Sequence, residues 1–524
     1  MKRLIDIPSG LLLLLVLLAT GLAFGYAHLS DAAVLGAYAL LFLPWALLLF
    51  SAGPFSAGPF SADKSSDKLL GWAPLIAAAV AVRLVFLFAE PLLSDDIFRY
   101  VWDGRVAQAG INPFLYAPDA QALEHLRDAS LWPQINHPQV PTIYPPAAQM
   151  LFRLNAALGG GVVMLRALFL LVEAAALVAI WAILTHTGEA ASAAFKKRAF
   201  VVYALCPLVF VETAWSGHLD VVAWMPLVAA LLLFVRTRTV GMAAAAGAIL
   251  GLSIAAKFLG LLAIPLLVLW RPSDPKVASL RRQIGRRVAL VATCAAVVAV
   301  SYLPYIDAGP KLFTAFGNYA SKWQGNDGPF RAAAAITEAR LEALAPAEPT
   351  TRTERVDGEL IFRFPEFNED FERLGLTRTW QGQEVPATSF SAAQIAQSIA
   401  KGLAALAVAL AMLWALLVRR DPIAGTLIVL LTLFLVAPIV HPWYVAWLVP
   451  LAALRHSPAA LTFSFAVLAA YFAWMSARAG GPWEVPVWAV VVEYGLVGGM
   501  LLIDHGANRR PRNTTMPPIC GPQS

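Results

Sequence analysis

The chain is 524 residues long, and 59% of its residues are hydrophobic whereas only 14% are charged. Soluble domains carry about 25% charged residues, so the composition excludes a set of ordinary soluble domains and indicates a polytopic membrane protein. The net charge of +6 reflects basic residues between apolar runs and does not indicate nucleic-acid binding. The cysteines Cys206, Cys294 and Cys520 lack the spacing of a disulfide framework or a metal-ligand motif.

Apolar runs recur along the chain and predict an all-α bundle of about fourteen transmembrane helices. The longer runs are 10–27, 33–50, 70–89, 160–184, 199–215, 219–235, 288–305, 393–418, 423–440, 459–476 and 486–503. The shorter pieces are 240–255 and 258–270, which we expect to form a hairpin of short helices, and 443–454. The first run follows Lys2 and Arg3 as a signal peptide would, but no cleavage site follows, so we interpret it as the first helix.

The distribution of Lys and Arg predicts the orientation, because short cytoplasmic loops are enriched in them. The basic segments are Lys2–Arg3, Lys64–Lys68, Lys196–Arg198, Arg236–Arg238, 271–287, Arg419–Arg420, Arg455 and 509–512. They alternate correctly if both termini are cytoplasmic, in a bacterial plasma membrane. The basic segments on both sides of 240–270 then require that stretch to cross twice, with Lys257 at its tip. Two large loops, 91–159 and 306–392, lie on the outer face.

The chain divides accordingly into five parts. They are 1–69, with two spans and an inside linker; 70–305, the transmembrane core with the first outside loop; 306–392, a second outside loop or small subdomain; 393–503, the C-terminal helices; and 504–524, a disordered inside tail. The first outside loop ends in a proline-rich stretch and an amphipathic helix at 147–158, so we expect a lid pressed on the bilayer. The charged segment 337–390 shows no catalytic pattern.

The most informative stretch is Ser94–Arg105, which places three carboxylates and two guanidiniums directly after an apolar span. One interpretation is structural. Ser94 would be an N-cap, and Asp95 and Asp103, each four residues from Arg99, would form an ion-pair ladder. The other is catalytic, since paired carboxylates near cations can deprotonate a sugar hydroxyl while an anionic leaving group is stabilised. Local spacing does not decide between them.

The segments 94–106, 109–118, 135–138 and 141–146 together resemble bacterial integral-membrane glycosyltransferases of the GT-C class. The closest group is the polyprenyl-phosphate-mannose-dependent mannosyltransferase-like family. Weaker matches are Gly217–Asp220, Lys257, Trp323 with Asn326, and His441–Tyr444, so that the resemblance covers most of residues 70–503.

The resemblance implies a GT-C-like bundle in the lipid membrane, a polyprenyl-phosphate sugar donor, and a glycan or glycolipid acceptor on the outer face. It also implies a single inverting displacement with an acidic general base in the first outside loop, which maps onto Asp95 or Asp96. Many members of the class carry this acid after the first span, whereas here it follows the third. We therefore expect two helices to have been added at the N-terminus.

Further site residues are hypotheses of the same kind. Lys257, Arg99 and Arg105 are the candidates for binding the donor phosphate, although Lys257 could snorkel and Arg99 could pair with Asp103. The predicted substrate-binding residues are Tyr100, Asp103, Asn112, His137, Tyr144, His218, Asp220, His441, Trp443 and Tyr444. An aromatic belt with helix caps would account equally well for those around His218 and His441.

No cofactor is predicted with confidence. His137, His218, Asp95, Asp96 and Asp220 could ligate a divalent metal, but no ligand spacing demands one. Among other functions, a transporter or flippase of a lipid-linked or small polar substrate is the main alternative. Ionisable residues within the helices would suit a substrate pathway, namely Arg83, Glu173, Lys257 and Glu493. No internal repeat supports that alternative. A polymerase or ligase of surface polysaccharide is a further one.

Overall fold

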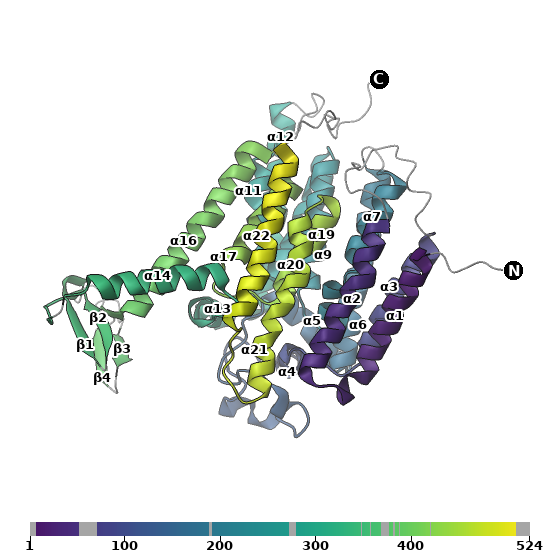
Figure 1. Ribbon diagram of the computed structural model, residues 1–524. Coiled ribbons are helices and arrows are strands. Elements are labelled where there is room, and N and C mark those ends of the chain that lie inside the picture. Colours follow the sequence, from purple (N-terminus) through teal and green to yellow (C-terminus); the bar gives the residue numbers. More distant parts are fainter. Residues whose placement is uncertain are drawn as a thin grey trace.

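The computed structural model describes residues 7–51, 71–187, 191–271, 279–346 and 348–509, apart from short gaps at 357, 368–376, 381–382, 387 and 420. Across these residues the chain forms an all-α bundle with a small β unit at its side (Figure 1). The predicted linker from residue 52 to 69 and the predicted tail from residue 510 lie outside the described residues. Helix α22 (Val487–Arg509) continues past residue 504, where the tail was expected to begin.

Seven described helical segments are long and apolar enough to cross a membrane. They are α1 (Ile7–Gly25), α2 (Asp31–Ser51), α6 (Val162–His186), α12 (Leu280–Tyr302), α16 (Ala392–Trp414), the joined pair α20 (Pro458–Ala466) and α21 (Tyr471–Arg478), and α22. Shorter apolar helices complete the bundle: α3 (Trp72–Leu87), α9 (Val221–Arg236), α10 (Val240–Ala256), α11 (Ala263–Val268), α17 (Pro422–Val436), α18 (Pro442–Val445) and α19 (Leu448–Leu454). This confirms an all-α polytopic membrane protein.

One predicted span is a broken helix. Residues 199–215 form the end of α7 (Ala193–Ala204), the short α8 (Pro207–Phe210) and a π-helical turn, η5 (Val211–Trp215). Pro207 explains the break, because proline cannot donate the backbone hydrogen bond that a continuous helix requires. With this segment included, every predicted span corresponds to helix in the structure. Lys257 directly follows α10 in extended conformation, at the tip of the expected hairpin.

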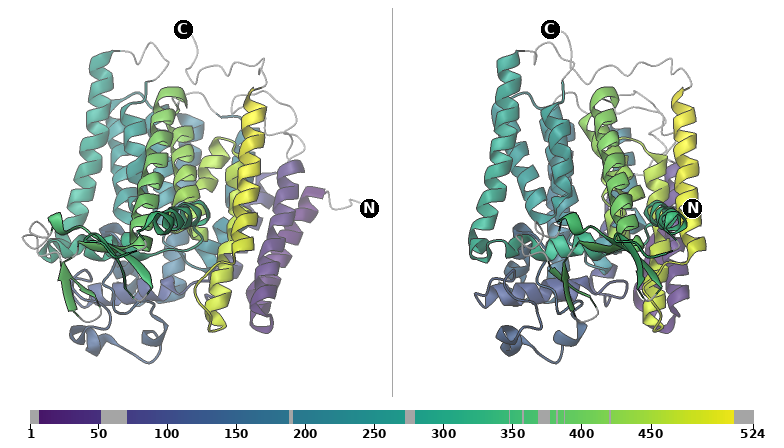
Figure 2. Two further views of the ribbon diagram at one scale, coloured as in Figure 1. Left: turned by 60° about the vertical axis from the view of Figure 1, so that its left-hand side comes forward. Right: turned by 90° about the vertical axis from the view of Figure 1, so that its left-hand side faces the viewer.

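Two helices of the first large loop, α4 (Asp96–Gln108) and α5 (Pro146–Ala157), lie across one end of the bundle (Figures 1 and 2). We call this the polar end. The two helices touch through Gly104, where a β-carbon would lie 2.2 Å from the Phe152 carbonyl oxygen, so that only glycine fits. Tyr100 stacks on Phe152 with ring centroids 4.8 Å apart. The helix expected at 147–158 is therefore present, and it packs on the helix that carries the acidic pair.

The described parts of the second large loop form two helices and a small β unit. Helix α13 (Lys311–Lys322) lies near the polar end, and α14 (Gly328–Leu344) leads away to the β unit at the side of the bundle (Figure 1). Strands β1 (Thr353–Val356), β2 (Glu359–Arg363) and β5 (Ser389–Ser391) form an antiparallel sheet in the order β1-β2-β5, and β3 (Thr377–Trp380) pairs with β4 (Gln383–Pro386).

Gly325, between α13 and α14, joins this loop to the C-terminal helices. Its amide donates to the Pro438 carbonyl at 3.0 Å, and its carbonyl accepts from the Val440 amide at 2.9 Å. The second loop is thereby held directly beside His441. Asn326 continues the connection, since its side-chain amide donates to Glu493 of α22 at 3.0 Å.

A buried ion pair holds the middle of the bundle together. Arg83 of α3 makes two hydrogen bonds of 2.8 Å to Glu173 of α6 and donates to the carbonyls of Ala79 and Ala204. Tyr203 of α7 adds a third hydrogen bond to Glu173, at 2.8 Å. Such a pair is tolerated inside an apolar bundle because each charge is compensated and hydrogen-bonded. Arg83 and Glu173 are therefore partners that join three helices.

Candidate active site

A π-helical turn brings Glu212 and His218 together at the end of α8. The amide of Ser216 donates to the Val211 carbonyl at 2.9 Å, and the amide of His218 donates to the Glu212 carbonyl at 2.8 Å. Gly217 then takes a φ of +72°, and a β-carbon there would lie 2.9 Å from Ile97, so a side chain is excluded by backbone conformation and by space. Extra-wide turns of this kind occur frequently at functional sites.

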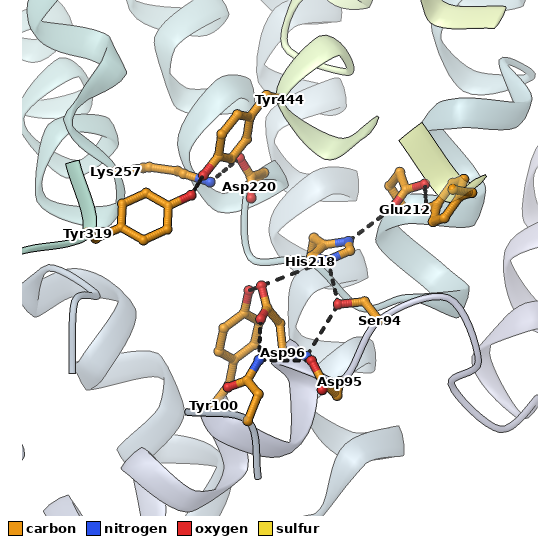
Figure 3. A network of polar contacts seen from close by, with 12 residues as sticks. Ser94, Asp95, Asp96, Tyr100, Glu212, His218, Asp220, Lys257, Tyr319 and Tyr444 are labelled. Atoms are coloured by element: carbon orange, nitrogen blue, oxygen red, sulfur yellow. Dashed lines mark hydrogen bonds and ion pairs between the residues drawn. The ribbon is translucent and has the colours of Figure 1, made fainter. Parts of the chain in front are cut away.

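His218 connects Glu212 to the acidic pair of α4. Its Nδ1 lies 3.0 Å from Glu212 Oε2, and its Nε2 lies 3.1 Å from the Ser94 hydroxyl and 4.0 Å from Asp96 Oδ2. Figure 3 shows His218 between Glu212 on one side and Ser94 with Asp96 on the other. Both Glu212 and His218 are fully buried, whereas Asp96 is partly exposed. Asp96 is thus the accessible end of a chain of polar groups that leads into the protein.

The two aspartates are held together by one amide. Asn136, from the proline-rich part of the first loop, donates to Asp95 Oδ1 at 2.8 Å and to Asp96 Oδ1 at 2.7 Å. The Tyr100 hydroxyl lies 3.4 Å from Asp96 Oδ2. Partial desolvation and the neighbouring charge of Asp96 raise the pKa of Asp95, against the lowering effect of Asn136. Asp96 therefore has more polar partners than Asp95.

Residues with aromatic rings at the start of α18 pack against His218. The Trp443 ring stacks on His218 with centroids 3.7 Å apart, and the His441 ring stacks on Trp443 at 4.2 Å. Burial lowers the pKa of His441 to about 3, so its imidazole is neutral. Neither His441 nor Asp220 caps its helix with its side chain. Helix capping therefore does not explain why these residues are here.

Lys257 and Asp220 form a second charged group near His218. Lys257 Nζ lies 2.6 Å from Asp220 Oδ1 and 4.4 Å from the centre of the Tyr444 ring. Trp447 also donates to Asp220 Oδ1, at 2.7 Å, whereas Asp220 Oδ2 is buried without a hydrogen-bond partner. The Tyr444 hydroxyl meets that of Tyr319 from α13 at 2.6 Å, so that the second loop reaches the same group of residues (Figure 3).

Both candidate arginines are engaged elsewhere. Arg99 is buried, pairs with Asp103 at 2.9 Å, and donates to the carbonyls of His137 and Val140. Arg105 pairs with Asp128 and donates to the Leu126 carbonyl. Of the two predicted ion pairs of Arg99, the one with Asp103 is present. The described hydrogen bonds and ion pairs include no contact between Arg99 and Asp95. Both arginines therefore bind parts of the first loop.

Three other candidates have structural contacts. Asn112 donates to Asp307 at 2.6 Å and so joins the two large loops. The His137 ring meets Trp323 edge to face at 5.2 Å. Tyr144 packs edge to face on Tyr100 at 4.8 Å, directly behind Asp96. Tyr144 thus lies against Tyr100, and His137 directly follows Asn136, so both are one residue removed from the acidic pair.

The helix carrying the pair also begins differently from the expectation. Asp95, and not Ser94, occupies the N-cap position of α4, and its side chain makes no cap hydrogen bond. The Ser94 hydroxyl accepts from the Asp96 amide at 3.3 Å and faces His218. Because the carboxylates are not used for capping, they stay available for chemistry.

Some residues of the site were not anticipated from the sequence. Glu212 was hidden within an apolar span, where an ionisable side chain is itself a signal of function. Asn136, Ser94 and Tyr319 are ordinary polar residues, and only the fold brings them to the acidic pair or to Tyr444. Within the described residues no group of three or more His, Cys, Asp or Glu side chains could hold a metal ion.

The fold and this site define a polytopic membrane protein with acidic, basic and aromatic groups gathered near one end of its bundle. The model of the alpha-(1->6)-mannopyranosyltransferase N-terminal domain matches residues 13–272, and that of the MptB C-terminal domain matches residues 375–503. The chain therefore belongs to this mannosyltransferase family and is an integral-membrane glycosyltransferase. Comparison with curated proteins and with solved structures finds no match.

Proposed function

We propose that the protein transfers mannose from a polyprenyl-phosphate-mannose donor to a glycan or glycolipid acceptor by a single inverting displacement with Asp96 as general base. The observation that carries the proposal is the position of Asp96, which is partly exposed and linked through His218 to buried Glu212. A carboxylate in this position can accept a proton from a substrate hydroxyl, and His218 and Glu212 can respond to the change in its charge.

The proposed displacement forms one bond to C1 of the sugar and breaks another. The acceptor hydroxyl attacks C1 of the sugar, its proton moves to Asp96, and the C1–O bond to the phosphate breaks with its electron pair remaining on the phosphate oxygen. If the product is the α-linked mannoside of the family's description, inversion requires a donor of β configuration at C1. A donor of α configuration would be inert.

Lys257 is the candidate for stabilising the departing phosphate. Its ammonium group has three donors, and Asp220 accepts from one of them, so the others can meet phosphate oxygens. Charge developing on a leaving group is stabilised most strongly by a preorganised cation in a site with little water. A lipid phosphate already is a leaving group, so no nucleotide-binding domain is needed.

The charge distribution supports placing the polar end on the outer face of the plasma membrane. Helix α9 runs from Asp220 in the site to Arg236, and α12 begins with Arg281 and Arg282 and ends close to the first loop. Basic residues therefore concentrate at the end opposite the site, as expected for the cytoplasmic side.

The test uses purified protein with polyprenyl-phosphate-mannose and a mannan acceptor, and follows release of polyprenyl phosphate. Asp96→Asn should lower kcat about 100- to 10,000-fold, the range for losing a general base, whereas Asp95→Asn should keep most of the activity. Both proteins should elute and unfold like the wild type. Full turnover by Asp96→Asn, or no turnover by wild type with any lipid-phosphate sugar, would refute the proposal.

A further inference from the structure

We propose that Glu212 and His218 act as a buried pair that receives the proton from Asp96, with Glu212 positioning the imidazole and compensating its charge. The proposal rests on the proposed function, because it takes Asp96 as the group that deprotonates the acceptor. It adds Glu212 to the reaction, together with the N-terminal helix that holds it.

The hydrogen-bond partners of Glu212 assign the protons. Its Oε1 accepts from the Tyr471 hydroxyl at 2.5 Å and from the Tyr38 hydroxyl at 3.3 Å. Its Oε2 lies 3.0 Å from Nδ1 of His218, at ion-pair distance, and neither of these two buried atoms has a hydrogen-bond partner among the described residues. The two hydroxyl donors make Oε1 an acceptor, and we assign a proton to Nδ1 of His218 because it would place a donor next to the otherwise unpartnered Oε2. Nε2 is therefore left with its lone pair toward Ser94 and Asp96.

The environment of His218 suits a ring that gains a positive charge. A buried carboxylate requires a compensating positive group, and the one adjacent to Glu212 among its described contacts is this imidazole. The face of Trp443 covers the ring at 3.7 Å and 19°, and an aromatic face attracts a cation. Asp96 lies at the other edge of the ring. His218 thus has an anion at each end and an aromatic face beside it.

The proton moves in two transfers, first from the acceptor hydroxyl to Asp96 and then from Asp96 to His218. The acceptor oxygen gives its proton to Asp96 Oδ2 as the C1–O bond to the acceptor forms and the bond to phosphate breaks. Asp96 then passes the proton to His218 Nε2, which requires their 4.0 Å separation to shorten by about 1 Å. After the product leaves, the proton returns through Asp96 to water. Asp96 is ionised again, and the phosphate retains its charge until it departs.

This assignment gives the N-terminal helices a role. Tyr38 belongs to α2, one of the two N-terminal helices that we expected to have been added before the catalytic loop. Its side chain is fully buried beside Tyr471 of α21, with ring centroids 6.2 Å apart. Helices from the two ends of the chain thus meet on one oxygen of Glu212. The N-terminal pair supports the site directly.

The experiment compares kcat and KM for Glu212→Gln, Glu212→Asp and the matched control Glu173→Gln, in the same assay. Glu173 is an equally buried carboxylate that also accepts from a tyrosine, but it lies in the Arg83 network. Glu212→Gln should lower kcat about 100-fold and leave the donor KM unchanged. Glu212→Asp keeps the charge and should recover activity to within about tenfold of wild type. Glu173→Gln should lower thermal stability while the folded protein keeps its kcat.

If Glu212→Gln fails to fold, His218→Asn tests the same pair without altering the carboxylate, and the same loss of kcat is expected. Wild-type kcat in either variant, or equal losses in Glu212→Gln and Glu173→Gln, would overturn the inference. Measuring Asp96→Asn in parallel distinguishes failure of the proposed function from failure of the Glu212–His218 inference. An active Asp96→Asn would remove the proposed function itself, whereas an inactive Asp96→Asn beside a fully active Glu212→Gln would remove only this inference.

Discussion

Glu173 and Glu212 are both buried in spans of the same bundle, but they have different kinds of partner. Glu173 is bound by Arg83, a permanent cation whose remaining donors are occupied by carbonyl groups. Glu212 is bound by two tyrosines and an imidazole that can gain or lose its charge. A permanent, fully satisfied pair holds helices together, whereas a titratable partner leading to an exposed carboxylate can take part in a reaction.

The largest expected effect would come from breaking the permanent pair. Arg83→Met leaves Glu173 buried without a cation and should lower the free energy of unfolding by about 3–5 kcal/mol. Thermal unfolding in detergent measures this loss. Arg478→Met is the control, because its pair with Asp31 is largely exposed and should contribute about 0–1 kcal/mol. Equal losses in the two variants would show that burial does not distinguish the pairs.

The next prediction distinguishes Lys257 from Arg99 by their effects on the KM for the donor. Lys257→Gln should raise the donor KM about 10- to 100-fold, since a charge-assisted hydrogen bond to phosphate is lost. Arg99→Gln should destabilise the first loop without a comparable change in donor KM, because the guanidinium is occupied by Asp103 and two carbonyls. Steady-state kinetics with varied donor concentration measures both. A larger KM effect from Arg99→Gln would reverse the assignment.

A smaller effect concerns Asp95 and pH. The pKa of Asp95 is raised above its ordinary value of 3.8 by partial desolvation and by Asp96, so the folded state binds this proton more tightly than the unfolded state. The resulting stabilisation is present below the ordinary pKa and is lost as pH rises through the raised pKa. Asp95→Asn should therefore match or slightly exceed wild type in melting temperature at neutral pH. The gain should vanish in acid, and a clear loss at neutral pH would contradict this explanation.

The smallest expected effect concerns the second loop. Tyr319→Phe removes the hydrogen bond to Tyr444 but keeps the ring, and should change kcat/KM by about two- to fivefold, the worth of one neutral hydrogen bond. Tyr494→Phe, which loses a hydrogen bond to the Asn326 carbonyl farther along the same loop, is the control and should leave kcat/KM near the wild-type value. Equal effects would mean that the loop is coupled to the site as a whole.

Much of the architecture could be predicted because its signals are local. Apolar run length depends on the lipid environment and on the nearest residues, and the described helices follow the predicted runs. The orientation that the basic segments predict stays a prediction. The turn at Lys257 was predicted in the same way. Helix α7 to η5 was expected as one span, because the apolar pattern does not register the break at Pro207 or the wide turn that follows.

For the candidate site, the sequence indicated several residues that lie together, but it did not reveal the partners of the two arginines. The acidic pair, His218, Lys257 and Trp443 lie in connected groups at the polar end. Arg99 and Arg105 were ranked by charge and proximity in the sequence, and their partners come from residues more than twenty positions away. Spacing along a helix reveals an i,i+4 partner such as Asp103, but it cannot reveal a carbonyl supplied by another loop.

The sequence by itself determined that the chain spans a membrane, where its apolar helices lie, and that Ser94–Arg105 is the segment to examine, because composition and motif are properties of neighbouring residues. Only the tertiary structure decided which carboxylate has a route into the protein. Tyr38, Glu212, His218 and Tyr471 come from opposite ends and the middle of the chain. They form one group, joined by two hydrogen bonds and an ion pair, because helix packing, the wide turn at Val211–Trp215 and the left-handed Gly217 bring them together.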